Sequence, residues 1–148
     1  MIPKIFLDTN ILLDLLQQRP GYEDSSRILQ AGESGKLRLC CSYLTMANIA
    51  FILRKSVSKA ALVPTLLQIQ SIIEVLPMDA DQLRESYWIS GRDFEDVLQA
   101  VCAAKAGCTT IVTNNIKDFQ FKITKELSAR GLSLPPIITP SALLAGMA

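Results

Sequence analysis

The sequence contains no histidine, and this absence excludes several kinds of catalytic site. Serine and cysteine nucleophiles that depend on a histidine base cannot be assembled, and a zinc site cannot use histidine ligands. The cysteines also lack the spacing of zinc-ligand pairs. We therefore expect reduced, mostly buried thiols of a cytosolic protein at these positions. They are Cys40, Cys41, Cys102 and Cys108.

Long apolar runs are missing as well. No uninterrupted apolar segment approaches the ~20 residues that a membrane-spanning helix needs. Lys4 and Asp8 interrupt the region where a signal peptide would lie, and Asp14 breaks the apolar stretch that follows. The sequence therefore predicts a cytoplasmic protein with no membrane contact.

A strong charge of one sign is also lacking, because 15 basic and 14 acidic residues leave a net charge of +1. A protein that coats nucleic acid should be more basic, whereas an enzyme that holds a short stretch through metal ions need not be. The net charge therefore neither supports nor excludes a nucleic-acid partner. Several basic residues either contact phosphates or form an ordinary solvated face. They are Arg54, Lys55, Lys59, Lys117, Lys122 and Lys125.

The length and patterning predict one domain over residues 1–148. Short apolar runs alternate with helical patterns along the chain. Strands are expected over residues 4–7, 37–41, 73–76, 109–113 and 137–139. Helices are expected over residues 10–18, 22–33, 42–56, 59–71, 79–90, 93–106 and 123–129, with a short one after Pro140. This alternation predicts an α/β fold, a three-layer α/β/α sandwich with a central parallel sheet.

Polar residues follow the first and fourth of these strands. The first strand stops at Asp8, and the fourth reaches Asp118 shortly after its end. Open α/β sheets bind ligands beyond the carboxyl ends of their strands. The two carboxylates therefore suggest a site for a hard metal ion at one edge of the sheet. Asp8 is equally suited to cap the helix that begins near Asn10, and Asp118 is suited to a turn.

Two further segments carry candidate site residues. The densest acidic group is Asp93, Glu95 and Asp96, which fits a capped helix start. Asp96 also opens a helix that looks buried on most sides, where a carboxylate must be paired or bound to metal. Asn48 lies in an otherwise apolar helix, so its amide either ties backbone groups together or lines a metal pocket. Asp14 and Asp24, by contrast, are expected to be solvated.

These segments, in this order, resemble the PIN-domain family, the nuclease fold of VapC-type bacterial toxins. The resemblance rests on residues 6–14, 42–49, 93–100 and 111–119 and covers nearly the whole chain. It implies that Asp8 and Asp96 are the first and third acids of the family's site. The second and fourth positions fall on Asn48 and Asn115, so amides replace two carboxylates. Asp118 could supply the missing charge. The chain thus resembles a PIN subgroup whose motif carries asparagine at both places.

The resemblance implies a metal-dependent endoribonuclease that hydrolyses RNA with Mg²⁺ or Mn²⁺ held by carboxylates. The implied ligands are Asp8, Asp93, Asp96 and Asp118. Asn48 joins Asp8, Asp96 and Asp118 in the implied catalytic set, and Asn10, Thr113 and Asn115 support it. The resemblance also implies a homodimer and a role as the toxin of a toxin–antitoxin pair, with an antitoxin protein as partner.

Two alternatives remain open from the sequence. The replaced carboxylates allow a weakened PIN domain that binds RNA or a protein without cutting it. A phosphatase of the aspartate-nucleophile type fits less well, because Asn10 stands where such phosphatases carry a second aspartate. A phospho-receiver also fits less well, because the strand over residues 73–76 is followed by Pro77, Met78 and Asp79, a poor match to the aspartate that receivers carry after a central strand.

Overall fold

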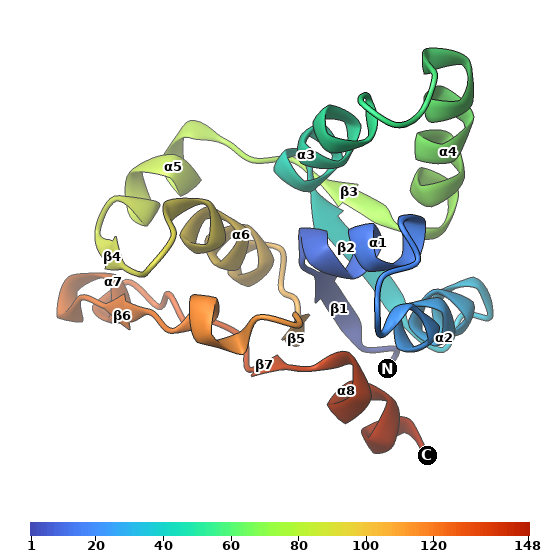
Figure 1. Ribbon diagram of the computed structural model, residues 1–148. Helices are drawn as coiled ribbons and strands as arrows, with labels where there is room; N and C mark the ends of the chain where they lie inside the picture. The colour runs from blue at the N-terminus through green and yellow to red at the C-terminus, as the bar shows by residue number, and fades with distance from the viewer.

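The computed structural model describes residues 1–148, apart from the side chain of Glu126, and is built around a five-stranded sheet. The strands lie in the order β3-β2-β1-β5-β7, and every neighbouring pair is parallel (Figure 1). Their bounds are β1 Lys4–Leu7, β2 Arg38–Ser42, β3 Glu74–Leu76, β5 Thr110–Val112 and β7 Ile137–Ile138. The predicted parallel sheet is confirmed, with its five strands within one or two residues of their expected bounds.

Helices cover both faces of this sheet. One face packs against α1 Thr9–Leu16, α2 Tyr22–Glu33, α3 Tyr43–Leu53, α4 Lys59–Ile72 and α8 Pro140–Met147. The other face packs against α6 Phe94–Lys105, which in turn contacts α5 Ala80–Ser86. The predicted three-layer sandwich is therefore confirmed. No helix in the described part of the chain is long and apolar enough to cross a membrane.

Strand β1 shows why the strands read as continuous apolar runs. Successive side chains of a strand point to opposite faces of the sheet. Ile5 and Leu7 are buried in the core beside α1 and α2, whereas Phe6 is buried beside α6. A strand that is covered on both faces needs apolar residues at every position. The run ends at Asp8, where the strand leaves the sheet.

The sequence does not predict a small antiparallel sheet that lies to one side of the main sheet. It consists of β4 Ile89–Ser90 and β6 Lys122–Ile123, with Ile89 opposite Ile123. Ile89 is buried with Val97 and Leu127. Strands of two residues are too short to show alternation, so this pairing depends on tertiary packing that the local sequence does not reveal.

The same packing shortens two of the expected helices. Helix α5 ends at Ser86 instead of residue 90, and α7 Lys125–Ala129 begins two residues later than expected. The missing residues belong to the β4–β6 sheet and its approach. A short 3₁₀ helix, η1 Ile116–Phe119, also follows β5. Helix α2, by contrast, has the predicted bounds.

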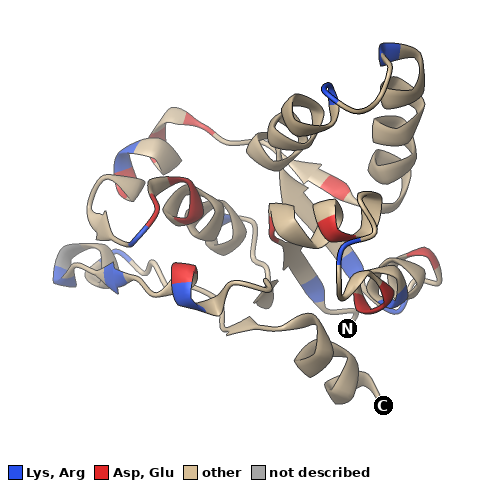
Figure 2. Ribbon diagram, viewed as in Figure 1, with Lys and Arg blue, Asp and Glu red and all other residues tan. Residues whose placement is uncertain are grey.

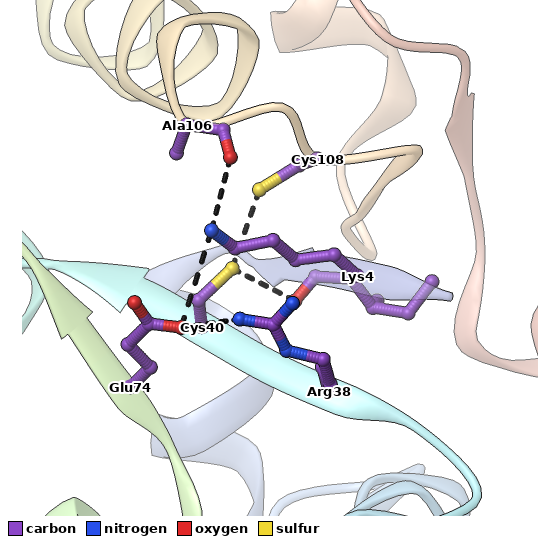
Figure 3. A network of polar contacts seen from close by, with 7 residues as sticks. Lys4, Arg38, Cys40, Glu74, Ala106 and Cys108 are labelled. Carbon is purple, nitrogen blue, oxygen red and sulfur yellow. Dashed lines mark hydrogen bonds and ion pairs between the residues drawn. The ribbon is translucent and has the colours of Figure 1, made fainter. Parts of the chain in front are cut away.

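Charged side chains connect three strands at their amino ends, which is the end of the sheet remote from Asp8 (Figure 3). Lys4 Nζ donates a hydrogen bond to the carbonyl oxygen of Ala106 at 2.9 Å and lies 3.9 Å from Glu74 Oε2. Arg38 Nη2 lies 3.5 Å from the same Glu74 oxygen. These contacts connect β1, β2 and β3 through one shared carboxylate.

All four cysteines are free and buried, as predicted. Cys40 Sγ donates to the carbonyl oxygen of Ile5 at 3.3 Å and lies 3.3 Å from Cys108 Sγ (Figure 3). Contact with Cys108 and burial raise the pKa of Cys40. Burial raises the pKa of Cys41 and of Cys102 to about 12. These three groups are therefore protonated thiols that pack as small apolar side chains.

Candidate active site

An acidic cavity of about 400 Å³ lies beyond the carboxyl end of β1. The cavity is lined by residues from the start of α1, from α3, from the start of α6 and from η1. Six of the predicted site residues are among them. They are Asp8, Asn10, Asn48, Asp93, Asp96 and Asp118. The fold thus brings together residues that are far apart in the sequence.

Asp8 both caps a helix and faces this cavity. Its side chain is only 4% exposed, and its Oδ1 accepts a hydrogen bond from the backbone N–H of Thr9 at 2.7 Å. Its Oδ2 accepts from Thr113 Oγ1 at 2.8 Å. The two interpretations of Asp8 are therefore compatible: the cap fixes a buried carboxylate in the wall of the cavity, where it can bind a cation.

Two of the predicted supporting residues lie behind Asp8 and do not line the cavity. Thr113 is fully buried at the end of β5, and its hydroxyl donates to Asp8. The backbone N–H of Asn115 donates to the same hydroxyl oxygen at 3.0 Å. The side chain of Asn115 is exposed. Asn115 therefore acts through its backbone in this arrangement, by orienting the threonine that holds Asp8.

Burial and like charge make the cavity unfavourable for ionised carboxylates. Burial raises the pKa of Asp8 to about 6, although the hydrogen bonds from Thr113 and Thr9 oppose this rise. Burial also raises the pKa of Asp96 to about 7, and the negative charge of Asp8 adds to this effect. Smaller contributions come from the neighbouring acids Asp93, Glu95 and Asp118. The cavity therefore holds more negative charge than its own surroundings balance.

The described residues offer this negative charge only weak compensation. Arg92 Nη1 lies 3.4 Å from Asp118 Oδ1, but the arginine side chain is 73% exposed. An ion pair that is so accessible to water contributes little. Asp93 caps α6 by accepting a hydrogen bond from the backbone N–H of Glu95 at 2.8 Å. The predicted capping role of Asp93 is confirmed, and its side chain also lines the cavity.

Glu95 is an acidic cavity residue that the sequence analysis placed in the acidic group but did not assign to the site. Its carboxylate accepts a hydrogen bond from the amide nitrogen of Asn48 and lines the cavity beside Asp96. Glu95 thus brings a carboxylate to the place where the resemblance leaves an amide. The signal for Glu95 in the sequence was Asn48, an amide at a position where the family usually carries an acid. An amide there leaves room for an acid from a neighbouring helix.

The expectation that Asp14 is solvated is wrong. Asp14 is 8% exposed, accepts a hydrogen bond from the side-chain amide of Asn114, and lies 3.8 Å from Arg19 Nη1. It therefore ties α1 to the turn after β5, close to Thr113. Asp24, in contrast, lies at the surface 4.0 Å from Arg27.

A buried network of hydroxyl and amide groups lies beneath the cavity. Thr45 Oγ1 lies 3.0 Å from Thr9 Oγ1 and accepts a hydrogen bond from Gln99 Nε2 at 2.9 Å. Ser42 Oγ donates to Gln99 Oε1 at 2.5 Å. These residues come from the start of α1, the start of α3 and the middle of α6. The network therefore fixes the spacing of three helices that carry cavity residues.

Replacing Gln99 by leucine tests this network. The substitution keeps a side chain of similar size but leaves the buried hydroxyls of Ser42 and Thr45 without their amide partner. We expect the free energy of unfolding to fall by about 1–3 kcal/mol, measured by urea titration. Gln68→Leu makes the same change at an exposed position of α4 and should have little effect. Equal stability of the two variants would show that the network does not hold these helices.

Comparison with known proteins assigns the fold to a family. Residues 4–117 match the family model described as PIN domain. This chain belongs to the PIN-domain family. The PIN domain described here is 25% identical over 118 residues to Ribonuclease VapC1 of Aquifex aeolicus (strain VF5). That match covers 76% of this chain and 81% of the relative.

Solved structures agree with the family assignment. The chain matches VapBC2 from Rickettsia felis, bound to a DNA fragment from their promoter, with a TM-score of 0.62 and 18% identity. That match covers 92% of this chain and 98% of the other. DNA-bound VapBC from Salmonella typhimurium matches with a TM-score of 0.64 and 19% identity, over 94% and 99% of the two chains. At these identities the structures show a shared PIN fold.

The cavity of this PIN domain offers donors suited to a hard divalent cation. Among the described residues, no three acidic side chains already form a closed set of metal ligands. The donors that face the cavity are carboxylate and amide oxygens, which Mg²⁺ and Mn²⁺ prefer over nitrogen or sulfur. The raised pKa values of Asp8 and Asp96 reflect burial and repulsion that a bound cation would relieve. The donor type and the charge therefore fit such an ion.

Proposed function

We propose that this PIN domain is a metal-dependent endoribonuclease that hydrolyses RNA phosphodiester bonds. The observation that carries the proposal is the convergence of Asp8 and Asp96 in one cavity, each with a pKa raised by burial and neighbouring acids. Two such carboxylates favour binding of a divalent cation. The similarity to a protein named as a ribonuclease supports RNA as the substrate.

The cavity residues would have distinct roles in binding the cation and in orienting its ligands. Asp8 and Asp96 would hold Mg²⁺ or Mn²⁺, with Asp93 and Asp118 binding it directly or through water. When bound, the cation would supply an activated water and would neutralise charge on the scissile phosphate. Thr113 and the backbone N–H of Thr9 orient the Asp8 carboxylate and favour its ionised form. The amide of Asn48 orients Glu95.

We further propose that the protein is the toxin of a toxin–antitoxin pair, forms homodimers and binds an antitoxin. The matched structures are described as VapBC assemblies, which supports a protein partner. Large apolar side chains on α3 and α4 are also exposed, some of them beside the cavity. They are Phe51, Ile52, Val63 and Leu67. Such a surface is suited to cover by another chain.

The proposed activity is tested with a labelled pool of mixed RNA sequences. The purified protein should cleave the pool with Mn²⁺ or Mg²⁺ and should stop when EDTA removes the cation. Sequencing the new ends would then identify the preferred cleavage context. Cleavage that continues in EDTA would contradict metal dependence, and no cleavage by a folded protein would contradict the nuclease proposal.

A second candidate function is an RNA- or protein-binding module without nuclease activity. The amides at Asn48 and Asn115 favour it, because they lower the negative charge available to a metal ion. Binding of Mn²⁺ separates the two functions. A module without catalysis need not bind Mn²⁺ in the acidic cavity, whereas the nuclease must, and Asp8→Asn and Asp96→Asn should weaken that binding.

Asp93 allows its structural and functional roles to be separated by two substitutions. Asp93→Ala removes the cap of α6 and should lower the free energy of unfolding by about 0.5–2 kcal/mol, measured by urea titration. Asp93→Asn should keep that stability, because asparagine is also a good cap. We expect both variants to retain more cleavage than Asp8→Asn. A stable Asp93→Asn variant that is as inactive as Asp8→Asn would instead make Asp93 a direct ligand.

A further inference from the structure

Two cysteine sulfurs are in contact inside the protein, apart from the acidic cavity. Cys40 Sγ lies 3.3 Å from Cys108 Sγ, although the two residues are 68 positions apart in the chain (Figure 3). Neither residue lines the acidic cavity. At this separation a movement of ~1 Å is enough to bring the two sulfurs to bonding distance.

The fold holds both cysteines in place. Cys40 lies within β2, which is paired with β1 on one side and with β3 on the other. The backbone N–H of Cys108 donates to the carbonyl oxygen of Ala103 at 3.0 Å, and the next N–H along the chain donates to the carbonyl oxygen of Lys4 at 2.8 Å. The contact between the sulfurs is therefore set by secondary structure on both sides.

A covalent bond between these sulfurs would connect two strands that are not neighbours in the sheet. Cys40 is in β2, and Cys108 comes just before β5, while β1 lies between these two strands. Both side chains belong to the core on the α6 side of the sheet. The bond would also close a long loop, and restricting a long loop in the unfolded chain favours the folded state.

Cys108 is the more reactive member of the pair. It is 8% exposed, whereas Cys40 is fully buried. Contact with Cys40 lowers the pKa of Cys108, and the positive charge of Lys4 adds to this effect, while burial opposes it. Figure 2 shows the basic residues on β1 and β2 close to an acidic residue on β3 at this end of the sheet. Because thiolates rather than thiols attack oxidants, Cys108 reacts first and Cys40 second.

The other two cysteines are placed differently. Cys41 follows Cys40 in β2 and therefore points to the opposite face of the sheet, into the core beside α1 and α2. Cys102 lies in α6, and its Sγ is 4.0 Å from the carbonyl oxygen of Pro77. Both are almost completely buried, and burial raises the pKa of each to about 12. They are matched controls for the contacting pair.

We propose that Cys40 and Cys108 are a thiol pair that hydrogen peroxide converts into a reversible disulfide, which locks β2 to the segment before β5. Hydrogen peroxide is small enough to reach a side chain with the slight exposure of Cys108. In a reducing compartment the pair stays as two thiols and closes only when an oxidant is present. This inference does not depend on the proposed ribonuclease function.

The reaction has two steps. In the first, the Cys108 thiolate attacks one oxygen of the peroxide, an S–O bond forms and the O–O bond breaks. The hydroxide that leaves takes up the proton that Cys108 released and becomes water. In the second, Cys40 Sγ attacks the sulfur of the Cys108 sulfenic acid, so the S–S bond forms and the S–O bond breaks. The departing hydroxide takes the proton of Cys40, and the two thiols have then given two electrons to the peroxide.

The bond is detected by counting thiols and mapping fragments of the folded protein. After treatment with a small excess of hydrogen peroxide, the chain is unfolded in N-ethylmaleimide, which labels every remaining thiol. The number of labels should fall from four to two, and dithiothreitol should restore four. Trypsin separates the candidates, because Cys108 lies in fragment 106–117, Cys102 in fragment 93–105, and Cys40 with Cys41 in fragment 39–54. We expect fragments 39–54 and 106–117 to be joined.

Single alanine variants identify the bonded sulfurs and the effect of the bond. Cys40→Ala and Cys108→Ala should each abolish the cross-link, whereas Cys41→Ala and Cys102→Ala should retain it. Oxidation should raise the urea midpoint of the unchanged protein, and dithiothreitol should reverse the rise. The midpoint of Cys108→Ala should not rise with peroxide. The fragment map of the unchanged protein gives an answer even if a variant fails to fold.

Several results would overturn this inference. They are four labelled thiols after peroxide treatment, a sulfenic or sulfinic acid at Cys108 without a cross-link, and a cross-link that joins fragment 93–105. A cross-link that persists in a folded Cys40→Ala variant would assign the bond to Cys41 and would also overturn it. A urea midpoint that stays constant or falls after the bond has formed would contradict the locking role.

Discussion

Asp8→Asn is expected to reduce metal-dependent RNA cleavage at least ~100-fold. Residues that only support a metal ligand already cost about 10–100-fold when removed, so loss of a direct ligand should cost more. Asparagine keeps the shape of the side chain and one oxygen that can accept the helix-capping hydrogen bond from Thr9. The loss should therefore arise from the missing charge. Initial rates on a labelled RNA with saturating Mn²⁺ measure the effect.

Asp24→Asn is the matched control for this substitution. It makes the same chemical change on α2, at a side chain that is 38% exposed and, among the residues that the structure describes, pairs with Arg27. Its cleavage rate should equal that of the unchanged protein. Wild-type cleavage by Asp8→Asn would remove the acidic cavity from the mechanism, even if the protein proved to be a nuclease.

The same Asp8→Asn variant is expected to be more stable than the unchanged protein at neutral pH in EDTA. Burial raises the pKa of Asp8 to about 6 from its ordinary 3.8, so the folded state disfavours the ionised form. By pH 8 the carboxylate is ionised in both states, and this cost is fully present. Asparagine carries no charge to bury. We expect a gain of roughly 1–3 kcal/mol in the free energy of unfolding at pH 8.

The raised pKa of Asp8 also determines how this stability difference depends on pH. As pH falls from about 6 towards 4, folded Asp8 takes up its proton before the unfolded chain does, and the cost disappears. The stability difference between the two proteins should therefore be largest above pH 6 and close to zero below pH 4. Urea titrations from pH 4 to 8 measure it, with Asp24→Asn as the flat reference. A variant that is less stable at pH 8 would show that the hydrogen bond from Thr113 outweighs the burial of charge.

The sequence predicted those features whose cause is local. The apolar run of β1 is long enough to identify a strand covered on both faces, and its end places Asp8 at the carboxyl edge of the sheet. Asp93 was recognised as a helix cap because capping depends on residues within one turn. Asn48 was recognised because a lone amide in an apolar helix must find a partner, and it does so in Glu95.

The features that the sequence did not predict depend on contacts between distant segments. Asp14 looks like a surface acid until Asn114, one hundred positions later in the chain, donates to its carboxylate. The β4–β6 sheet exists because Ile89 packs against α6 and α7. Helix periodicity predicts burial on one face but cannot show which polar group of another element lies opposite. Glu95 belongs to this class, because only the placement of α3 beside α6 brings it to Asn48.

The amino and carboxyl ends of the central strands differ in how much stability a substitution there would remove. At the amino ends of the strands, Lys4 and Arg38 both pair with Glu74, and that network shares no residue with the acidic cavity. At the carboxyl ends of the strands, carboxylates lie close together, and their repulsion and burial lower the stability of the folded state. Replacing one of those acids with an amide is therefore expected to cost the folded state little stability. The acidic side chains of the cavity can therefore change while the architecture persists.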